Sequence, residues 1–591
     1  MTHHPGLVSL GPKKQASSFP AEVAAVKFTG FRTMIGETFA FGTGNGTAET
    51  ADEALLYLDS SANWVDTTAK DDSMASPAGT GTMIITSVCE HEGRVYAANA
   101  GTMVNNSSDN HVLKIIRTDV NSPAAWNSYS TSNTTNGIGA ALPYGLETDG
   151  NLMYVSEWVA GSNTITVAES SNDGVAWNAF TSDPVILSAD APRGAVMYSD
   201  SAGALDYWVS TAEGLWRVDI SAETTKRELE FWHSDSSHTG QMNVCGGYIC
   251  VSDGPTLHRL RWMDSGILLD DVIFTSESLP ALKRGDITAL TFVPGYNWHV
   301  VAVGGQDGSH NAGIYLIKPG AENTWETHNL YYNATANRVV YGLGFTTETA
   351  GTPRILFAED NGVSNDSAAY HLDEIARDPR TVSSYKHASA GKFVLPKNDR
   401  YLPEFDSAWR KIEFVGTAFD SSEKVTDIFA QQDAGIEDTN GSSWGSTLGE
   451  VTSSGSSVSF AATPSNTGES GKAMQIFISL EGGSDASPYI EAVNVHVKKR
   501  LPRKYIRSFV VDITGSANGT ARPRQAVIDD LESIVSAVTD ASVTYGEEGA
   551  IIMEPWDGGD GTLAYTDDPE EPGTVKAHQN VEFAVLSLVE V

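Results

Sequence analysis

Paired carboxylates are the first groups in this sequence whose types could do chemistry. Two carboxyl groups facing each other across a cleft can cleave a glycosidic bond, one as the acid and the other as base or nucleophile. Adjacent pairs such as Asp270 and Asp271, or Asp529 and Asp530, occur in a chain with 75 acidic residues. At that density pairs arise by chance, so the sequence predicts solvated surface pairs and identifies no catalytic residue.

Oxygen-rich loops and cysteines are the candidate metal ligands. The segments 557–562 and 360–366 carry Asp and Asn side chains that suit calcium, but neither has the EF-hand spacing, so ordinary turns are the simpler prediction. Cys245 and Cys250 have no companion Cys pair or His cluster, which excludes a disulfide scaffold and argues against zinc. We therefore predict buried cysteines and no metal site.

The histidines are scattered along the chain. His91, His111, His258 and His299 lie beside separate apolar runs, and His3 and His4 lie in a terminal segment expected to be mobile or bound to a partner. The sequence has no nucleophile elbow, Walker loop or Rossmann fingerprint in a strand-turn-helix context. The prediction is a protein without catalytic or cofactor-binding residues and without a cofactor.

One sequence pattern recurs seven times between about residues 40 and 372: a short apolar run, a Gly- or Asp-rich turn and a second apolar run. A period of roughly 40 to 60 residues without helical periodicity is typical of four-stranded blades arranged radially. The sequence therefore predicts a β-propeller, with seven blades, and a tandem of β-sandwiches is the alternative. The first runs are Phe39–Phe41, Val95–Ala98, Met153–Val155, Tyr207–Val209, Ile249–Val251, Val300–Val303 and Ile355–Ala358. The second runs are Ala54–Leu58, Val112–Ile116, Thr164–Ala168, Leu215–Val218, Leu257–Leu260, Ile314–Ile317 and Ala368–Leu372.

The segment from Ser171 to Trp177 resembles the Asp-box of sialidase-type propellers. In that family the acidic side chain caps a hairpin and the aromatic packs beneath it, so the resemblance implies structure and not catalysis. A sialidase also needs an arginine cluster and a Tyr/Glu nucleophile pair. Arginines are present in different blades, outside the family's Arg-Ile-Pro context, at positions Arg193, Arg217, Arg284 and Arg354. A glycan-cleaving enzyme that uses the central funnel stays open as an alternative.

The net charge limits the kinds of partner that the protein can bind. The 75 acidic and 38 basic residues give a charge of −37, which argues against nucleic-acid binding because phosphate contacts need a basic face. Such a surface serves solubility, or suits strong brine, as in proteins of salt-loving organisms and their viruses. We find no apolar stretch near 18 residues and no signal peptide, so we expect no membrane span and synthesis in a host cytoplasm.

Length and pattern changes predict four parts: an N-terminal arm (1–20), a propeller (21–380), an antiparallel β-sandwich (384–499) and a small α+β domain (500–591). Before the last part, Lys498 to Lys504 is either a solvated connector or a basic docking strip. The sandwich strands are expected at Trp409–Val415, Val425–Phe429, Val458–Ala461, Ala473–Leu480 and Tyr489–Val497.

The α+β part is expected to contain one helix opened by Pro523, with an apolar stripe of Val527, Leu531, Ile534, Val535 and Val538. Strands are expected at Tyr505–Ile513, Ser542–Tyr545, Ala550–Met553 and Val581–Val591, with a loop at Trp556–Gly573. We also expect an early strand, such as Val23–Phe28, to close the propeller by joining its last blade.

The region after Ser384 resembles the C-terminal portion of structural tail and baseplate proteins of long-tailed viruses of bacteria and archaea. Four features carry the resemblance: the two runs Ala473–Glu481 and Pro488–Val497, the basic Pro-containing link, the strand-helix-strand module, and the ending Glu582–Val591. It implies a virion protein that assembles with copies of itself and other tail proteins and displays the propeller to a host glycoprotein or polysaccharide. A capsid-attached fibre or turret is a further alternative. The candidate contact aromatics are Tyr144, Trp158 and Trp232, although we expect each of them to be in the core.

Overall fold

A computed structural model gives the fold of the 591-residue chain. The residues that it describes are 10, 12–16, 27–34, 37–43, 55–58, 64–66, 84–100, 111–117, 126–132, 142–159, 161–170, 177–180, 186–199, 203–234, 238–263, 268–279, 283–304, 311–320, 324–336, 338–347, 353–360, 367–373, 385–395, 407–432, 444, 447–460, 469–471, 473–483, 485–499, 506–512, 526–531, 541–544, 550–555, 563–566 and 583–590.

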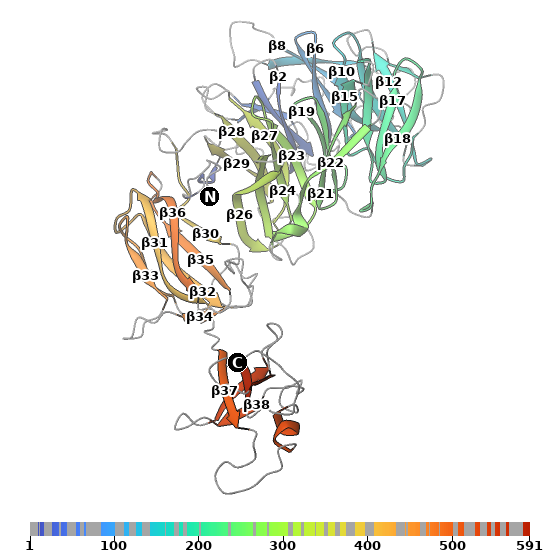
Figure 1. The fold of residues 1–591 in the computed structure, drawn as a ribbon. Coiled ribbons are helices and arrows are strands. Elements are labelled where there is room, and N and C mark those ends of the chain that lie inside the picture. Colours follow the sequence, from blue (N-terminus) through green and yellow to red (C-terminus); the bar gives the residue numbers. More distant parts are fainter. Residues whose placement is uncertain are drawn as a thin grey trace. The chain divides into compact units, whose positions relative to one another are not determined.

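The described chain is mainly β (Figure 1). Its helical segments include residues 526–531 and the 3-10 turn Ser276–Ser278. No helix in this part of the chain is long and apolar enough to cross a membrane. Two compact units divide the molecule: Met1–Tyr401 with Ala408–Val497, and Leu402–Ser407 with Lys498–Val591.

Up to Asp373 the described strands form seven antiparallel sheets. The first four are β2 (Lys27–Met34), β3 (Glu37–Thr43), β4 (Leu55–Leu58), β5 (Trp64–Asp66); β6 (Ile85–His91), β7 (Arg94–Asn99), β8 (His111–Arg117), β9 (Trp126–Ser132); β10 (Leu142–Thr148), β11 (Met153–Val159), β12 (Thr164–Ser170), β13 (Asn178–Ala179), β14 (Ile186–Leu187); and β15 (Gly194–Ser199), β16 (Leu205–Ser210), β17 (Gly214–Asp219), β18 (Thr224–Glu230). The other three are β19 (Met242–Cys245), β20 (Tyr248–Asp253), β21 (Thr256–Trp262), β22 (Leu268–Thr275); β23 (Ile287–Val293), β24 (Trp298–Val303), β25 (Asn311–Pro319), β26 (Trp325–Ala336); and β27 (Val340–Thr346), β28 (Arg354–Asp360), β29 (Ser367–Asp373), β1 (Gln15–Ala16).

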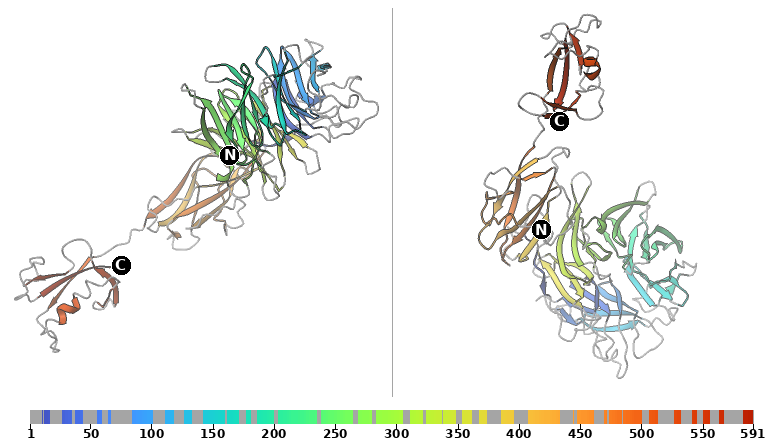
Figure 2. Two further views of the ribbon diagram at one scale, coloured as in Figure 1. Left: turned by 90° about the vertical axis from the view of Figure 1, so that its right-hand side faces the viewer. Right: turned by 90° about the horizontal axis from the view of Figure 1, so that it is seen from below.

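The first strands of these sheets, which we call the inner strands, follow one another around a propeller-like ring (Figure 2). Each contacts the next in the order β2, β6, β10, β15, β19, β23, β27, and β27 contacts β2 again. Glycine permits the close approach at this last contact. A Cβ atom on Gly342 of β27 would lie 2.9 Å from the backbone nitrogen of Gly30 on β2, so a larger residue would force the two strands apart.

The apolar runs expected from the sequence are the second and third strands of every sheet, and the prediction of their positions is confirmed. The expectation that an early strand completes the last sheet is confirmed, but the residues named for that strand are wrong. Lys27 and Phe28 belong to β2, an inner strand, and Val23 to Val26 lie outside the described residues. The last sheet is instead completed by β1, whose Gln15 pairs with His371 of β29. A strand of two residues carries no alternation by which the sequence could reveal it.

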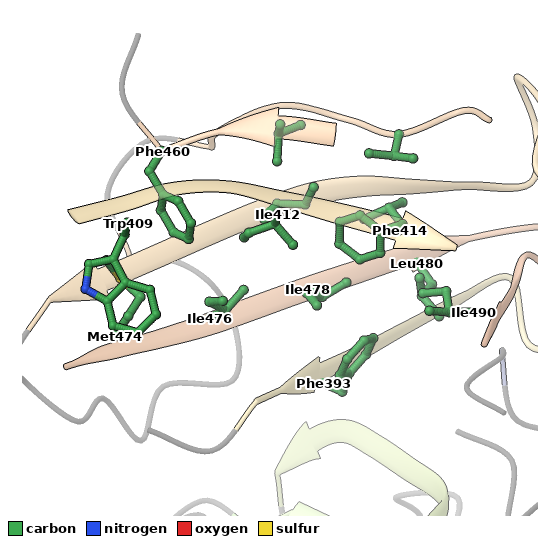
Figure 3. Close-up of a cluster of buried hydrophobic side chains, with 14 of the residues drawn as sticks. Phe393, Trp409, Ile412, Phe414, Phe460, Met474, Ile476, Ile478, Leu480 and Ile490 are labelled. Carbon is green, nitrogen blue, oxygen red and sulfur yellow. The ribbon is translucent and has the colours of Figure 1, made fainter. Parts of the chain in front are cut away.

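Residues 385–499 form two further antiparallel sheets. One contains β30 (Ala390–Val394), β35 (Met474–Glu481) and β32 (Lys424–Gln432); the other contains β33 (Ser457–Ser459), β31 (Ser407–Thr417), β34 (Glu469–Gly471) and β36 (Tyr489–Lys499). Side chains of both sheets share one core, with Trp409, Ile412 and Phe414 of β31 facing Ile476 and Ile478 of β35 (Figure 3). This is the packing of two half-buried sheets face to face, and the five expected strands are all present.

The N-terminal segment joins this core to the ring. Leu10 is fully buried among the side chains of β31, β32 and β35. Its backbone N–H donates to Ser487 Oγ at 2.9 Å, and Pro12 forms a β-bridge with His387. Lys14 forms an ion pair with the buried Glu359 of β28, and its ammonium lies 3.6 Å from the ring centroid of Tyr370 on β29. Leu10 and residues 12–16 therefore belong to both structures.

The second unit holds one sheet of β37 (Ile506–Asp512), β38 (Ala541–Thr544), β39 (Ala550–Pro555), β40 (Leu563–Thr566) and β41 (Phe583–Glu590). β41 is central and pairs with β37, β39 and β40. β40 lies where the sequence predicted only a loop, so that prediction is wrong. In helix 526–531 the buried side chains are Ile528 and Leu531, and Val527 is half-buried. Pro523, Ile534, Val535, Val538 and the basic residues 500–504 lie outside the described residues.

Candidate binding site at the mouth of the ring

One end of the ring gathers the starts of all the inner strands. Each sheet contains antiparallel strands in sequence order, so its second strand ends, and the next inner strand begins, on the same side of the ring. We call this end the mouth. Lys27, Tyr144 and Tyr341 lie at the starts of β2, β10 and β27, and Arg193 and Asp286 immediately precede β15 and β23. Side chains far apart in sequence therefore converge.

Electrostatic coupling shows that these groups are close. Burial lowers the pKa of His238, in the connection before β19, to about 4. The Asp286 carboxylate acts in the opposite direction, while the charges of Lys27 and Arg193 lower the pKa further. The imidazole is therefore neutral at pH 7, when it can both donate and accept a hydrogen bond. Four sequence regions contribute to a single electrostatic environment.

Lys27 is packed against an aromatic ring on the first side of the mouth. Its ammonium lies 3.8 Å from the ring centroid of Tyr341, whose hydroxyl lies 3.5 Å from Asp360 Oδ2. Burial lowers the pKa of Lys27, and the Asp360 carboxylate partly restores it. Arg338 Nη1 lies 3.6 Å from Asp360 Oδ1. The result is a half-buried group of donors and acceptors in which two cations share one carboxylate.

A second group lies around Arg193. Its guanidinium is 3.5 Å from Asp190, and its backbone N–H donates to the Ser210 carbonyl at 2.9 Å. Burial raises the pKa of Tyr144, and the charge of Arg193 lowers it. The Tyr144 ring packs edge-on against Trp158, with centroids 6.4 Å apart. Two of the three candidate contact aromatics are thus partly buried against each other.

Trp232 differs from both. Its side chain is 91% exposed, so the expectation that it lies in the core is wrong. Its position is nevertheless fixed, because the backbone N–H groups of Trp232 and His233 donate to the buried Asp253 carboxylate at 2.8 and 2.9 Å. Thr239 Oγ1 donates to the His233 carbonyl at 2.8 Å and accepts from Gly254 N–H at 3.0 Å. The connection from β18 to β19 therefore holds an indole at the rim of the mouth.

The arginines named from the sequence are divided among three places. Arg193 and Arg284 precede inner strands at the mouth, whereas Arg354 begins β28 at the opposite end. Arg217 is on β17, 3.6 Å from Asp206 and 3.4 Å from Glu228. This distribution does not supply the arginine cluster of a sialidase.

Other candidates from the sequence serve cross-strand pairing. Asp270 accepts from His258 at 2.9 Å, and Asp271 accepts from Arg259 at 2.9 Å. His91 bonds Thr148, His299 is fully buried, and Cys245 and Cys250 are free and buried as predicted. Asp529 and Asp530 are exposed on the helix. The positions outside the described residues are His3, His4, Asp173, Asp366, Asp557 and Asp560, and of His111 only the backbone is described.

Sequence reasoning missed Lys27, His238 and Asp286. The usable signal was positional, because each stands at or just before an inner strand. The repeated sequence pattern marked only the second and third strands of each sheet. The inner strands were therefore not aligned with one another in sequence, and the residues at their starts were not compared.

No protein-family model matches the chain, and no curated protein matches it. Among solved structures it is similar to the GH74 xyloglucanase from Xanthomonas campestris, with 11% identity and a TM-score of 0.36 over 61% of this chain and 55% of that one. It is also similar to the Dos1 propeller, with 11% identity and a TM-score of 0.34 over 61% of this chain and 95% of that one. The chain covers less than two thirds of the xyloglucanase. Likenesses this distant carry no information on activity.

Proposed function

We propose that this chain is a non-catalytic structural and adhesion protein of a virion, located in a viral tail tip or baseplate. Its seven sheets would be the blades of one closed propeller that presents the mouth to a host surface. The parts after residue 384 would be a β-sandwich and a small α+β domain that assemble with other copies of the chain and other tail proteins. The ring of inner-strand contacts and the completion of the last sheet by β1 support closure.

The non-catalytic function is supported by the carboxyl groups of Asp253, Glu147 and Glu157, which are either hydrogen-bonded to the protein or buried. Asp253 binds two backbone amides, and Glu147 accepts both guanidinium nitrogens of Arg32 at 2.8 and 2.9 Å. Burial raises the pKa of Glu157, at the mouth end of β11, to about 7, which suits a general acid. Its side chain is only 3% exposed, however, so a substrate cannot reach it. The most suitable acid is inaccessible.

The virion assignment has a separate basis in the sequence resemblance after Ser384. The segments that carry it fold as β35, β36 and β41. The buried N-terminal segment adds a mechanical reason for a display role, since it fixes the ring to the sandwich. A capsid-attached fibre or turret is compatible with the same geometry.

One observation favours a glycan-cleaving enzyme as the second candidate. The mouth combines acidic side chains, an arginine and aromatic rings, the groups that such an enzyme places around its funnel. The residues that fit this description best are Asp286, Asp360, Arg193 and Tyr144.

Incubation with host-envelope polysaccharide separates the two candidates. We expect the protein to bind the polysaccharide without creating reducing ends. New reducing ends that disappear in Asp286→Asn or Asp360→Asn would establish the enzyme instead.

A companion experiment tests assembly. A chain that ends at Val497 lacks the C-terminal unit but keeps every contact of Leu10. We expect it to remain soluble and to fail to enter particles. Normal incorporation, located by labelled antibody on whole particles, would refute the assignment of assembly to the C-terminal unit, and label on the capsid would favour the fibre or turret.

A further inference from the structure

We propose that the mouth is a binding site for a neutral saccharide chain, with Trp232 as the surface on which a sugar ring stacks. Two donor–acceptor pairs at the mouth, Lys27 with Asp360 and His238 with Asp286, would bind the hydroxyl groups. This inference rests on the proposed adhesion function and specifies its ligand.

The exposed indole is the first argument. Exposing a tryptophan side chain to 91% leaves a large apolar surface in water, and tryptophan is enriched among the residues that carry binding energy. The two hydrogen bonds from backbone N–H groups to Asp253 fix the backbone at Trp232 before any ligand arrives. Little backbone conformational entropy is therefore lost on binding. A flat, rigid aromatic suits the C–H face of a pyranose ring.

The pairing of charges is the second argument. A sugar hydroxyl donates one hydrogen bond and accepts others, so it is best met by a carboxylate beside a cationic or neutral donor. Asp360 lies near Lys27, and Asp286 lies near the neutral His238. Each group is partly desolvated, which strengthens its hydrogen bonds. Because a hydroxyl is neutral, its binding adds no charge to either pair.

The charge of the protein selects a neutral ligand over an acidic one. A field from a net charge of −37 repels a polyanion as it approaches, and the effect extends over about 10 Å at 0.1 M salt. At the mouth, the cations Lys27, Arg338 and Arg193 stand beside the carboxylates Asp360, Asp190 and Asp286. These six groups together offer no excess positive charge to a carboxylate. Uronate or sialate chains are therefore poor ligands.

The test uses the full chain and titration calorimetry with hexasaccharides. The neutral probes are the hexamers of glucose in β1-4 and α1-4 linkage, of mannose, and of N-acetylglucosamine; the acidic probe is the galacturonate hexamer beside its methyl ester. We expect at least one neutral probe to bind, with an affinity that stays within twofold between 0.1 and 1 M salt. We expect the galacturonate hexamer to bind at least tenfold more weakly than its ester.

Two tryptophan variants and a matched control locate the site. Trp232→Ala should weaken binding at least tenfold, and Trp232→Phe should restore most of it. Tyr296→Ala removes another exposed ring, 49% exposed, from the turn between β23 and β24 at the opposite end of the ring, and should leave affinity unchanged. Unchanged melting of each variant would show that its fold is intact.

Three results would overturn the proposal: no binding of any neutral probe, equal binding by the Trp232→Ala and wild-type proteins, or preference for the acidic probe. These outcomes are distinct from failure of the adhesion function. If the Trp232→Ala variant binds host polysaccharide as strongly as the wild-type protein does, the adhesion function is supported and the proposed site is refuted. If the wild-type protein binds a neutral probe at Trp232 and also releases reducing ends, the proposed site is supported and the non-catalytic function is refuted.

Discussion

Leu10→Ala tests whether the N-terminal segment is part of the core. The side chain is 0% exposed and is surrounded by β31, β32 and β35. Its two methyl groups lie against Gly391 and Gly482, within 3.0 and 2.7 Å of the places where Cβ atoms would stand. Glycine has no side chain that could move into the space left behind. Buried Leu→Ala changes cost about 2 to 5 kcal/mol, and a site that cannot collapse lies in the upper part of that range, about 4 kcal/mol.

The assay is urea unfolding combined with hydrogen exchange of the β35 and β1 segments. We expect the unfolding transition of the two sheets in residues 385–499 to move to lower urea. Exchange should accelerate in both segments, because Leu10 and Gln15 are only five residues apart. Leu187→Ala is the matched control, since that leucine is 67% exposed and its loss should change the unfolding free energy by less than about 0.5 kcal/mol. Equal effects of the two substitutions would refute the docking of Leu10.

The remaining predictions concern charge. Burial raises the pKa of Glu157 to about 7, above its usual value, so its contribution to stability is complete at pH 4 and is lost as pH rises through 7. Glu157→Gln should therefore raise the melting temperature at pH 8 relative to wild type and do so much less at pH 5; an equal shift at both values would exclude ionisation as the cause. Melting temperature should also rise with sodium or potassium chloride from dilute buffer to molar salt, because 75 − 38 = 37 excess negative charges repel one another until ions screen them. A flat series would remove the interpretation that the protein is adapted to brine.

The second strand of each sheet was predictable because most of its residues are buried on both faces. β24, with the sequence Trp298–Val303, has five consecutive buried residues, and such runs stand out without any periodicity. Inner strands have a different composition, since they must approach one another at the axis. β27 contains Gly342 and Gly344, and β10 contains Gly145 with a φ of +60°. Glycine weakens a strand signal, so the strands that build the mouth were the least visible.

The candidate site was missed for a related reason. His238 and Asp286 lie in polar connections, and nothing in the local sequence distinguishes them from solvent-exposed turn residues. Only the ring brings the connections of separate sheets together. Trp232 was assigned to the core because most tryptophans are largely buried, and its exposure depends on Asp253, a carboxylate on the neighbouring strand that fixes the backbone of the connection. Tertiary contacts therefore override composition at this site.

The buried N-terminal segment also changes where the chain can be divided. The sequence places a boundary between propeller and sandwich near residue 384, and a cut there would be expected to leave a soluble propeller. Yet Leu10 lies in the core of the later sheets, and at about 3.5 Å per residue the five residues to Gln15 span no more than about 18 Å. Removing residues 384–591 would expose Leu10 and leave Pro12 without its bridge to His387, while β1 is still required by the last sheet. A chain that ends at residue 383 should therefore unfold at a lower temperature than one that ends at Val497. Equal melting of the ring in both would show that β1 pairs with β29 without help from the sandwich.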